Sequence, residues 1–292
     1  MKRFVLGTVQ LGLPYGRLRH SPLMTAKAAF RVLDSAWDLG VRNFDTAEAY
    51  GESAARLGEW IRERGHAAGV CVVTKCAVGL GGADRRISAA RAGAALSRFD
   101  QVGELTLLTH GAVEANEWDA VREVAARHGA FGGQSVYTAE EVRSACRLPR
   151  TGRVQAPGNV IDTRAVSARG ESPVPLDIRS VYLQGVLLEA PGRAESRAPG
   201  AFRLVTALQA AAAAVRVPLA AALVAGVLRM LRTGDRVVLG VDNESQLAVL
   251  SRVLEISDEV VDDFREAAVS LTADVDCEAI LDPRRWPMDD TG

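Results

Sequence analysis

Short apolar runs alternate along the chain with longer segments whose apolar residues recur at helical spacing. Apolar runs of roughly four to eight residues, bounded by polar or turn-forming residues, are typical of buried strands. We interpret eight runs as strands: Phe4–Thr8, Arg42–Asp45, Val70–Lys75, Glu104–His110, Gly133–Val136, Val154–Ala156, Asp177–Tyr182 and Arg236–Gly240.

The segments between these runs predict helices. Residues 25–40 begin with Thr25, a favoured N-cap residue, carry apolar residues at helical spacing and end at Gly40, a helix-stop residue. Residues 114–129 follow the same pattern, with Trp118 on the apolar face. Pro218 divides the alanine-rich residues 208–231 into two helices, and residues 244–254 predict a helix after the last strand.

Strand and helix alternate throughout, and this order predicts parallel strands joined by crossover helices. Eight such units in 292 residues favour an α/β fold of the closed (β/α)8 TIM barrel type. We expect a single domain over residues 1–292, with an irregular tail after about Asp282. An open, doubly wound sheet is the alternative. It is less consistent with the sequence, because the first strand leads into LGTVQLGLPYG, which lacks the G-x-G-x-x-G spacing and an immediate helix.

The composition is that of an ordinary globular protein, with 48% apolar residues and a formal net charge of −1. This balance gives no indication of nucleic acid binding. No uncharged apolar run reaches about 18 residues, so we expect no membrane span, and the start of the chain lacks the apolar core of a signal peptide. The four cysteines form no C-x-x-C pair, so we expect free thiols, a cytoplasmic location and no metal site.

The basic residues are mostly arginine. The 35 basic residues comprise three lysines, Lys2, Lys27 and Lys75, and therefore 32 arginines. Lys75 lies at the end of the apolar run VCVVTK, where a solvated surface charge is not expected. A buried lysine differs from arginine in having a compact charge and a readily shifted pKa, so Lys75 is a candidate functional residue before any motif is considered.

Four polar side chains are predicted to meet at one rim of the barrel. Asp45 ends the second predicted strand, Lys75 the third and His110 the fourth, and Tyr50 lies in the loop after Asp45. The carboxyl ends of all barrel strands open on one face, where sites are built. An ammonium near a phenol favours the phenolate, a carboxylate keeps the ammonium charged, and a histidine can donate a hydrogen bond to a substrate oxygen. The group therefore predicts a general acid directed at a carbonyl.

Each of the four residues also has a structural interpretation. Asp45 could cap the next helix, Tyr50 could be a rim aromatic, Lys75 could form a purely structural ion pair with Asp45, and His110 could simply end its strand. The functional interpretation is favoured because the residues fall at matching positions in the predicted barrel.

Several segments resemble the motifs of the aldo-keto reductase family. FDTAEAYG, VVTK and LTLLTHG are similar to the segments that carry the family's Asp, Tyr, Lys and His, and LGTVQLGLPYG resembles its opening strand and loop. GGQSVYTAEEV, VQAPGNVIDTR, SVYLQGVLL and VVLGVDNESQL resemble later segments in the family's order. The resemblance covers about Arg3 to Val253.

The resemblance implies a (β/α)8 barrel that binds NADPH, or less often NADH, in extended form and transfers hydride to an aldehyde or ketone. It implies that Tyr50 is the general acid, that Lys75 and Asp45 tune it, and that His110 orients the carbonyl. The expected partner is a small carbonyl compound, and no feature of the sequence indicates an oligomeric state.

The resemblance also implies which residues contact the cofactor. In order from the nicotinamide to the adenosine, these are Ser135 and Gln155 at the ring, Thr8, Val9 and Asp45 along the inner cleft, Ser180, Leu183 and Gly185 near the pyrophosphate, and Gly240, Asp242 and Gln246 at the adenosine end.

The cofactor half departs from the family's pattern at three places. Val136 stands where members often have Asn beside the nicotinamide amide, and Arg179 stands where an aromatic often stacks on the ring. Gly240–Gln246 lacks the cation that commonly holds a 2′-phosphate and carries Asp242 instead, so we expect only a weak preference for NADPH over NADH. Two alternatives to reduction remain: proton transfer without hydride, as in an epimerase, isomerase or lyase, and a barrel that binds without catalysing.

Overall fold

In the computed structural model, which describes residues 1–16, 22–77 and 89–287, eight parallel strands close into a barrel. The strands are β1 (Phe4–Gly7), β2 (Asn43–Asp45), β3 (Cys71–Ala77), β4 (Glu104–His110), β5 (Phe131–Ser135), β6 (Arg153–Pro157), β7 (Leu176–Arg179) and β8 (Arg236–Gly240). Each strand pairs with the next in chain order, and β8 closes the ring by pairing Val238 with Val5. The predicted (β/α)8 barrel is confirmed, and the open sheet is wrong.

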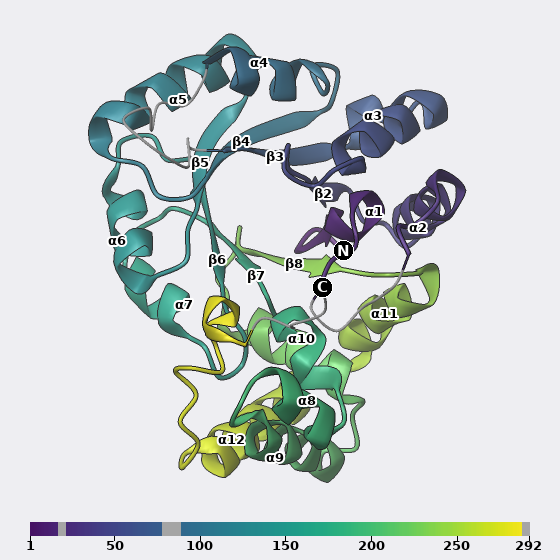
Figure 1. The fold of residues 1–292 in the computed structure, drawn as a ribbon, viewed down its shortest axis with the longest axis vertical. Coiled ribbons are helices and arrows are strands. Elements are labelled where there is room, and N and C mark those ends of the chain that lie inside the picture. The colour runs from purple at the N-terminus through teal and green to yellow at the C-terminus, as the bar shows by residue number, and fades with distance from the viewer. Residues whose placement is uncertain (17–21, 78–88, 288–292) are drawn as a thin grey trace.

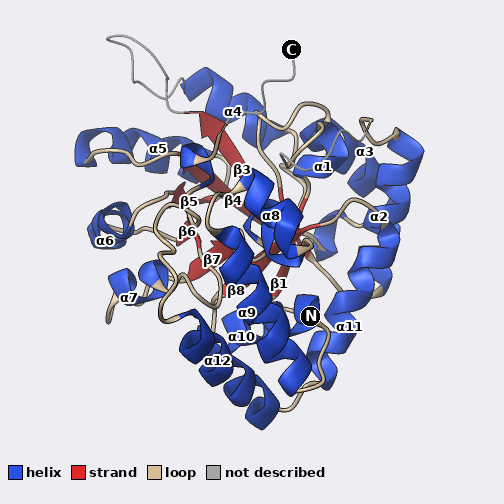
Figure 2. Cartoon of the chain, turned by 60° about the horizontal axis from the view of Figure 1, so that its bottom comes forward, coloured by secondary structure: helices blue, strands red, loops and turns tan. Residues whose placement is uncertain are grey.

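Helices surround the barrel (Figure 1). They are α1 (Val9–Gly12), α2 (Ala26–Asp38), α3 (Ser53–Arg64), α4 (Ala89–Ser97), α5 (Ala115–Arg127), α6 (Ala139–Arg147), α7 (Arg164–Arg169), α8 (Pro191–Arg197), α9 (Ala201–Ala214), α10 (Leu219–Met230), α11 (Ala248–Glu255) and α12 (Asp258–Thr272), with 3₁₀ helices η1 (Ala67–Gly69), η2 (Leu183–Leu188), η3 (Glu244–Leu247) and η4 (Pro283–Arg285). Figure 2 shows the strands at the centre of these helices. The group α8, α9 and α12 packs together as an outer layer below α10 in Figure 1.

Local sequence signals set several helix ends as predicted. The Thr25 side chain caps α2 by accepting a hydrogen bond from the backbone N–H of Ala28, and the helix ends shortly before Gly40, whose φ is +86°. Pro218 stands at the N-cap of α10 and separates it from α9. Within the part of the chain that the structure describes, no single helix is long and apolar enough to cross a membrane. Only α9 and α10 taken together meet that test, and they are bent by 89°.

Several strand and helix boundaries differ from the prediction, and three of these differences lie near the site. The helix α1 follows β1 directly, although no immediate helix was expected, because four residues are too few to show a helical period. The strand β3 continues beyond Lys75 to Ala77. The strand β7 ends at Arg179 rather than Tyr182, because Ser180 has φ +65° and turns the chain out of the sheet.

The tail after Asp282, for which we expected irregular structure, begins with a single 3₁₀ turn. This is η4, and the Asp282 side chain accepts a hydrogen bond from the backbone N–H of Arg284. Trp286 is 4% exposed, and its Nε1 donates to the carbonyl oxygen of Ile280. This burial anchors the tail against the body of the protein.

A buried ionic cluster fills the amino-terminal end of the barrel. Asp177 is fully buried and accepts hydrogen bonds from Arg153 Nη1 at 2.9 Å and from Arg236 Nε and Nη2, both at 2.9 Å. Arg236 Nη1 also donates to Asn43 Oδ1 at 3.0 Å, which links β8 to β2 across the interior. These residues lie at or next to the first residues of their strands, so the cluster plugs the end of the barrel opposite the cavity described below.

Candidate active site

Asp45 and Lys75 form a buried ion pair at the carboxyl end of the barrel. Asp45 is the last residue of β2 and is 3% exposed, and Lys75 lies in β3 and is 1% exposed. Lys75 Nζ donates to both carboxylate oxygens of Asp45, at 2.6 and 2.7 Å, and to the carbonyl oxygen of Thr46 at 3.2 Å. It also lies 3.4 Å from the hydroxyl of Tyr50. The predicted contacts of Asp45, Tyr50 and Lys75 are therefore present.

The charge of Lys75 is maintained by its partners. Burial favours the neutral amine and so lowers the pKa of Lys75, but attraction from Asp45, then from Tyr50, and the hydrogen bonds to both outweigh burial. The net effect is a raised pKa, so Lys75 is an ammonium at neutral pH. Because Lys75 is enclosed and donates toward the Tyr50 oxygen, it can stabilise negative charge there.

A chain of hydrogen bonds extends from Asp45 to the opposite strands. Gln155 Nε2 in β6 donates to Asp45 Oδ2 at 2.8 Å, and Ser135 Oγ in β5 donates to Gln155 Oε1 at 3.2 Å. Asp45 does not cap a helix, since α3 begins at Ser53. The alternative interpretation of Asp45 as a helix cap is therefore wrong, and its carboxylate instead connects Lys75 to Gln155.

The backbone of Tyr50 is held by direct contact with α1. The carbonyl oxygen of Gly12 accepts the N–H of Glu52 at 3.1 Å. A Cβ at Gly12 would lie 2.0 Å from the carbonyl oxygen of Tyr50, so only glycine permits this approach. Gly51 adopts φ +55°, and a Cβ there would lie 2.4 Å from the Gly12 oxygen. The segment AYGES therefore needs its glycine to place the phenol over Lys75.

His110 ends β4, as predicted, and faces Tyr50. The two rings are nearly perpendicular, at 89°, with centroids 6.3 Å apart. Desolvation, followed by the positive charges of Lys75 and Arg179, lowers the pKa of His110 to about 4. The imidazole is therefore neutral at neutral pH and carries one N–H, which can donate to a carbonyl oxygen.

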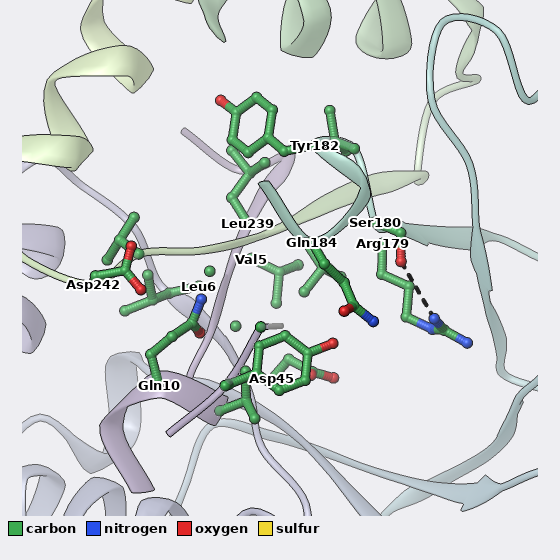
Figure 3. Close-up of a pocket in the computed structure, with 18 of the residues that line it drawn as sticks. Val5, Leu6, Gln10, Asp45, Arg179, Ser180, Tyr182, Gln184, Leu239 and Asp242 are labelled. Carbon is green, nitrogen blue, oxygen red and sulfur yellow. Dashed lines mark hydrogen bonds between the residues drawn. The ribbon is translucent and has the colours of Figure 1, made fainter. Parts of the chain in front are cut away.

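Asp45, Tyr50 and His110 line a cavity of about 560 Å³, part of whose wall is shown in Figure 3. This volume lies in the range typical of small-molecule sites. The predicted site residues on its wall are Val9, Asp45, Tyr50, His110, Ser135, Ser180, Gly185, Gly240, Asp242 and Gln246. Four others lie behind the wall and do not line it: Thr8, Lys75, Gln155 and Leu183, all at most 2% exposed. Thr8 there donates to the Asp45 carbonyl oxygen at 2.8 Å.

The floor of the cavity contains a residue that sequence reasoning missed. Gln10 projects from α1 between Asp45 and Asp242 (Figure 3). Its Oε1 is buried and has no hydrogen-bond partner among the residues that the structure describes. A Cβ at Gly240 would lie 2.6 Å from the Gln10 amide, so glycine at the end of β8 allows this amide to pack against the strand. No sequence pattern identified Gln10, because α1 itself was not predicted.

The loop after β7 has an unusual backbone. Ser180, Leu183 and Gln184 have φ values of +65°, +49° and +54°, and Gly185 has +91°. The left-handed region costs roughly 1–2 kcal/mol for each residue other than glycine. Such conformations persist where the surroundings impose them, and they cluster at functional sites. Ser180, Gln184 and Gly185 line the cavity, which is consistent with a binding role for this loop.

Two described arginines lie near the segment after β8, and each is paired with a carboxylate. Arg31 of α2 reaches this segment and donates to Glu244 at 3.2 Å, and Arg252 donates to Glu255 at 3.0 Å. Gln246 Oε1 accepts from the backbone N–H of Asp242 at 3.0 Å. Across the described residues, no group of three or more His, Cys, Asp or Glu side chains is placed to hold a metal ion.

Comparisons with known proteins support the fold and the resemblance of the amino-terminal motifs to a known family. Residues 3–101, which include Asp45, Tyr50 and Lys75, match the model of the aldo/keto reductase family. The structure is similar to the glycerol dehydrogenase AKR11B4 from Gluconobacter oxydans, with a TM-score of 0.71 at 16% identity over 99% of this chain and 94% of that one.

Two further solved structures show the same likeness. One is the aldo-keto reductase AKR11C1 from Bacillus halodurans in its holo form, with a TM-score of 0.66 at 15% identity over 91% of each chain. The other is the thermostable aldo-keto reductase Tm1743 in complex with epalrestat, with a TM-score of 0.66 at 17% identity over 91% of this chain and 95% of that one. No curated protein sequence matches the chain. The resemblance to aldo-keto reductases is therefore confirmed, while identities this low show the fold and not the substrate.

Proposed function

We propose that this chain, whose residues 3–101 match the aldo/keto reductase family, is an NAD(P)H-dependent oxidoreductase that reduces an aldehyde or ketone to an alcohol, with Tyr50 as the general acid. The observation that carries the proposal is the contact of a fully enclosed ammonium with a phenol at the cavity wall. Lys75 Nζ contacts Asp45 and Tyr50. Asp45 and Tyr50 line the cavity, whereas Lys75 lies behind its wall.

The cavity fits an extended nicotinamide cofactor in several respects. Gln10 lines the cavity, and its buried Oε1, which has no partner among the described residues, can accept from an amide or a hydroxyl group of the cofactor. Ser135, Ser180, Gly185 and Gln246 are the other wall residues proposed to hold it, with Asp242 at the adenosine end. When bound, the reduced nicotinamide supplies a hydride to the carbonyl carbon.

The protein's own residues supply the proton and the positioning. The neutral His110 donates its N–H to the carbonyl oxygen and so orients the carbonyl. Tyr50 gives its proton to the same oxygen, which completes the alcohol. The Lys75 ammonium stabilises the phenolate that Tyr50 becomes, and Asp45 holds Lys75 in place while Gln155 holds Asp45.

The adenosine end fits NADPH no better than NADH. A 2′-phosphate is normally bound by cationic and preferably bidentate partners. Arg31 and Arg252 are each engaged with a carboxylate. We therefore propose a preference for NADPH over NADH of less than about tenfold, equivalent to about 1.4 kcal/mol.

Proton transfer without hydride is the second candidate function. Tyr50, Lys75 and His110 can enolise a carbonyl compound without any cofactor. The pairing of both described arginines near the segment after β8, Arg31 and Arg252, with carboxylates favours this candidate. The proposal further includes a single barrel domain, a small carbonyl compound as the partner, and the cytoplasm, the location expected from the cysteine pattern.

The test is a panel of aldehydes and ketones assayed with NADH and with NADPH, following the loss of reduced-cofactor absorbance and the appearance of alcohol. We expect turnover with both cofactors and alcohol formed in equal amount to cofactor oxidised. Parallel reactions without cofactor in deuterated water report enolisation by proton exchange. Binding of cofactor with no reduction of any carbonyl would contradict the proposal, and cofactor-independent exchange would establish the second candidate.

A further inference from the structure

Arg179 is a cavity-lining cation with no carboxylate partner among the described residues. The charged side chains of the wall are Asp45, which is neutralised by Lys75, and Asp242 and Arg179. Arg179 Nη2 donates to the carbonyl oxygen of Val136 at 3.2 Å, and Nη1 donates to Ser180 Oγ at 3.4 Å. A guanidinium has five N–H donors, so these two neutral contacts leave donors available.

A second arginine on the same aromatic ring provides a contrast. The guanidinium carbon of Arg179 lies 4.5 Å from the centroid of the Tyr137 ring, and that of Arg284 lies 4.7 Å from it. Arg284 donates to both carboxylate oxygens of Asp282, each at 2.8 Å, so its charge is compensated. Arg179 is thus the arginine of this pair whose charge no described carboxylate compensates.

The position of Arg179 places its charge near the reacting groups. It is the last residue of β7 and lines the same cavity as Tyr50 and His110, on the side shown with Ser180 in Figure 3. Its charge contributes to the lowered pKa of His110, after desolvation and Lys75, which agrees with this placement. A cation beside a partly apolar cavity loses hydration, a cost that the Tyr137 ring offsets in part and a bound anion would offset further.

We propose that Arg179 binds an anionic group, a carboxylate or phosphate, on the carbonyl substrate, so that the enzyme prefers oxo acids and similarly charged aldehydes to neutral ones. The inference rests on the proposed function and names its substrate class. Arginine binds such groups through paired, charge-assisted hydrogen bonds. A cofactor phosphate offers the same oxyanion chemistry, and the experiment below separates the two sources.

The experiment compares Arg179→Gln, Arg179→Lys and, as the matched control, Arg284→Gln. Each is assayed with 4-carboxybenzaldehyde against 4-formylbenzamide, and with succinic semialdehyde against pentanal. Hydrogen bonds to charged groups contribute roughly 1.5–3 kcal/mol, so the anionic-to-neutral ratio of kcat/KM should fall about 10- to 100-fold in Arg179→Gln. Arg179→Lys should retain part of the ratio, because it keeps the charge but loses the paired geometry, and Arg284→Gln should keep it whole.

Cofactor affinity, measured by quenching of protein fluorescence, separates the two anion sources. An unchanged substrate ratio in Arg179→Gln overturns the proposal. If that unchanged ratio accompanies weaker binding of NADH and NADPH, the anion is a cofactor phosphate. Thermal melting checks that each variant is folded, and Arg179→Lys keeps the proposal falsifiable if Arg179→Gln does not fold.

Calorimetric titration of the cofactor-free protein with the same aldehydes separates this inference from the proposed function. Preferential binding of 4-carboxybenzaldehyde, lost in Arg179→Gln, supports the inference even if no carbonyl is ever reduced. Equal affinity of the wild-type protein for 4-carboxybenzaldehyde and 4-formylbenzamide overturns it, whatever reaction the enzyme performs.

Discussion

Each end of the barrel buries an aspartate that is paired with a different type of cation. At the carboxyl end, Asp45 is paired with Lys75, and the lysine also contacts Tyr50 at the cavity. At the amino end, Asp177 is paired with Arg153 and Arg236, and Arg236 also donates to Asn43.

Guanidinium and ammonium groups are suited to different roles at these two ends. A guanidinium keeps its charge, binds a carboxylate with a planar fork and fixes its partners in one geometry. In the ionic cluster around Asp177, these bonds hold four strands together. The ammonium of Lys75 is compact, and after binding Asp45 and a backbone carbonyl it still reaches a reactive phenol. The same electrostatic attraction therefore stabilises the barrel at one end and equips it for proton transfer at the other.

Removing the phenol hydroxyl at the carboxyl end of the barrel should have the strongest consequence for activity. Tyr50→Phe should lower kcat for carbonyl reduction by about 10²- to 10⁴-fold, because it removes the proton donor and little packing. Cofactor affinity and the unfolding midpoint should stay close to those of the wild type. Steady-state kinetics with fluorescence titration tests this, and wild-type turnover by the phenylalanine variant would remove Tyr50 from the mechanism.

Exchanging the type of cation tests the comparison most directly. Lys75→Arg should lower kcat by at least about 10²-fold, because the guanidinium does not fit a site shaped for an ammonium and cannot contact Asp45 and Tyr50 in the same way. Lys75→Met, which removes the charge at similar bulk, should be at least as inactive. The measurement is kcat for all three proteins, and an active arginine variant would show that the lysine serves only as a structural charge.

At the amino end of the barrel, removing the charge of a buried residue should change stability and leave catalysis unchanged. Asp177→Asn leaves two buried arginines without their anion, and breaking a buried pair costs about 3–5 kcal/mol. Urea denaturation should show a loss of that order in the free energy of unfolding, while kcat of the folded variant stays at the wild-type value. A loss below about 1 kcal/mol would mean that the cluster is only as strong as a surface ion pair.

A weaker consequence is expected for the pH dependence of stability. The pKa of His110 is about 4 in the folded protein and 6.5 as the ordinary value. Between these values the unfolded chain binds a proton that the folded protein does not, so His110 makes stability fall as pH falls from 6.5 towards 4. The free energy of unfolding should therefore depend less on pH in His110→Gln over this window. An identical pH dependence in both proteins would show that His110 titrates normally.

Much of the candidate site at the carboxyl end of the barrel was predictable from the sequence, because polar residues interrupt apolar runs where strands end. Asp45 and His110 stand at observed strand ends, and Lys75 was conspicuous as one of three lysines. Periodicity alone did not show that β3 continues through Cys76 and Ala77, because a charged residue such as Lys75 usually marks the end of an apolar run.

Other parts depended on contacts that no local pattern encodes. The ionic cluster around Asp177 joins residues from β2, β6, β7 and β8 that are far apart in the chain. In the sequence, each of them is an ordinary polar residue near the start of a strand. Gln10 lies on a helix of one turn. The contact between Arg284 and Tyr137 brings the tail, expected to be irregular, to the loop after β5. Positions of this kind follow from the closed barrel and not from any single segment.

Closure of the ring by β1 and β8 also has a consequence during synthesis. Because Val5 pairs with Val238, β1 cannot complete its pairing until β8 has left the ribosome. A nascent chain that stops before Arg236 lacks one of the two arginines that bind Asp177, and it leaves β1 and β7 with open edges. Open strand edges are sites of intermolecular pairing, and contacts between distant residues slow folding. Translation of this chain therefore passes through a long stage at which the barrel cannot close and an interrupted product is prone to aggregate.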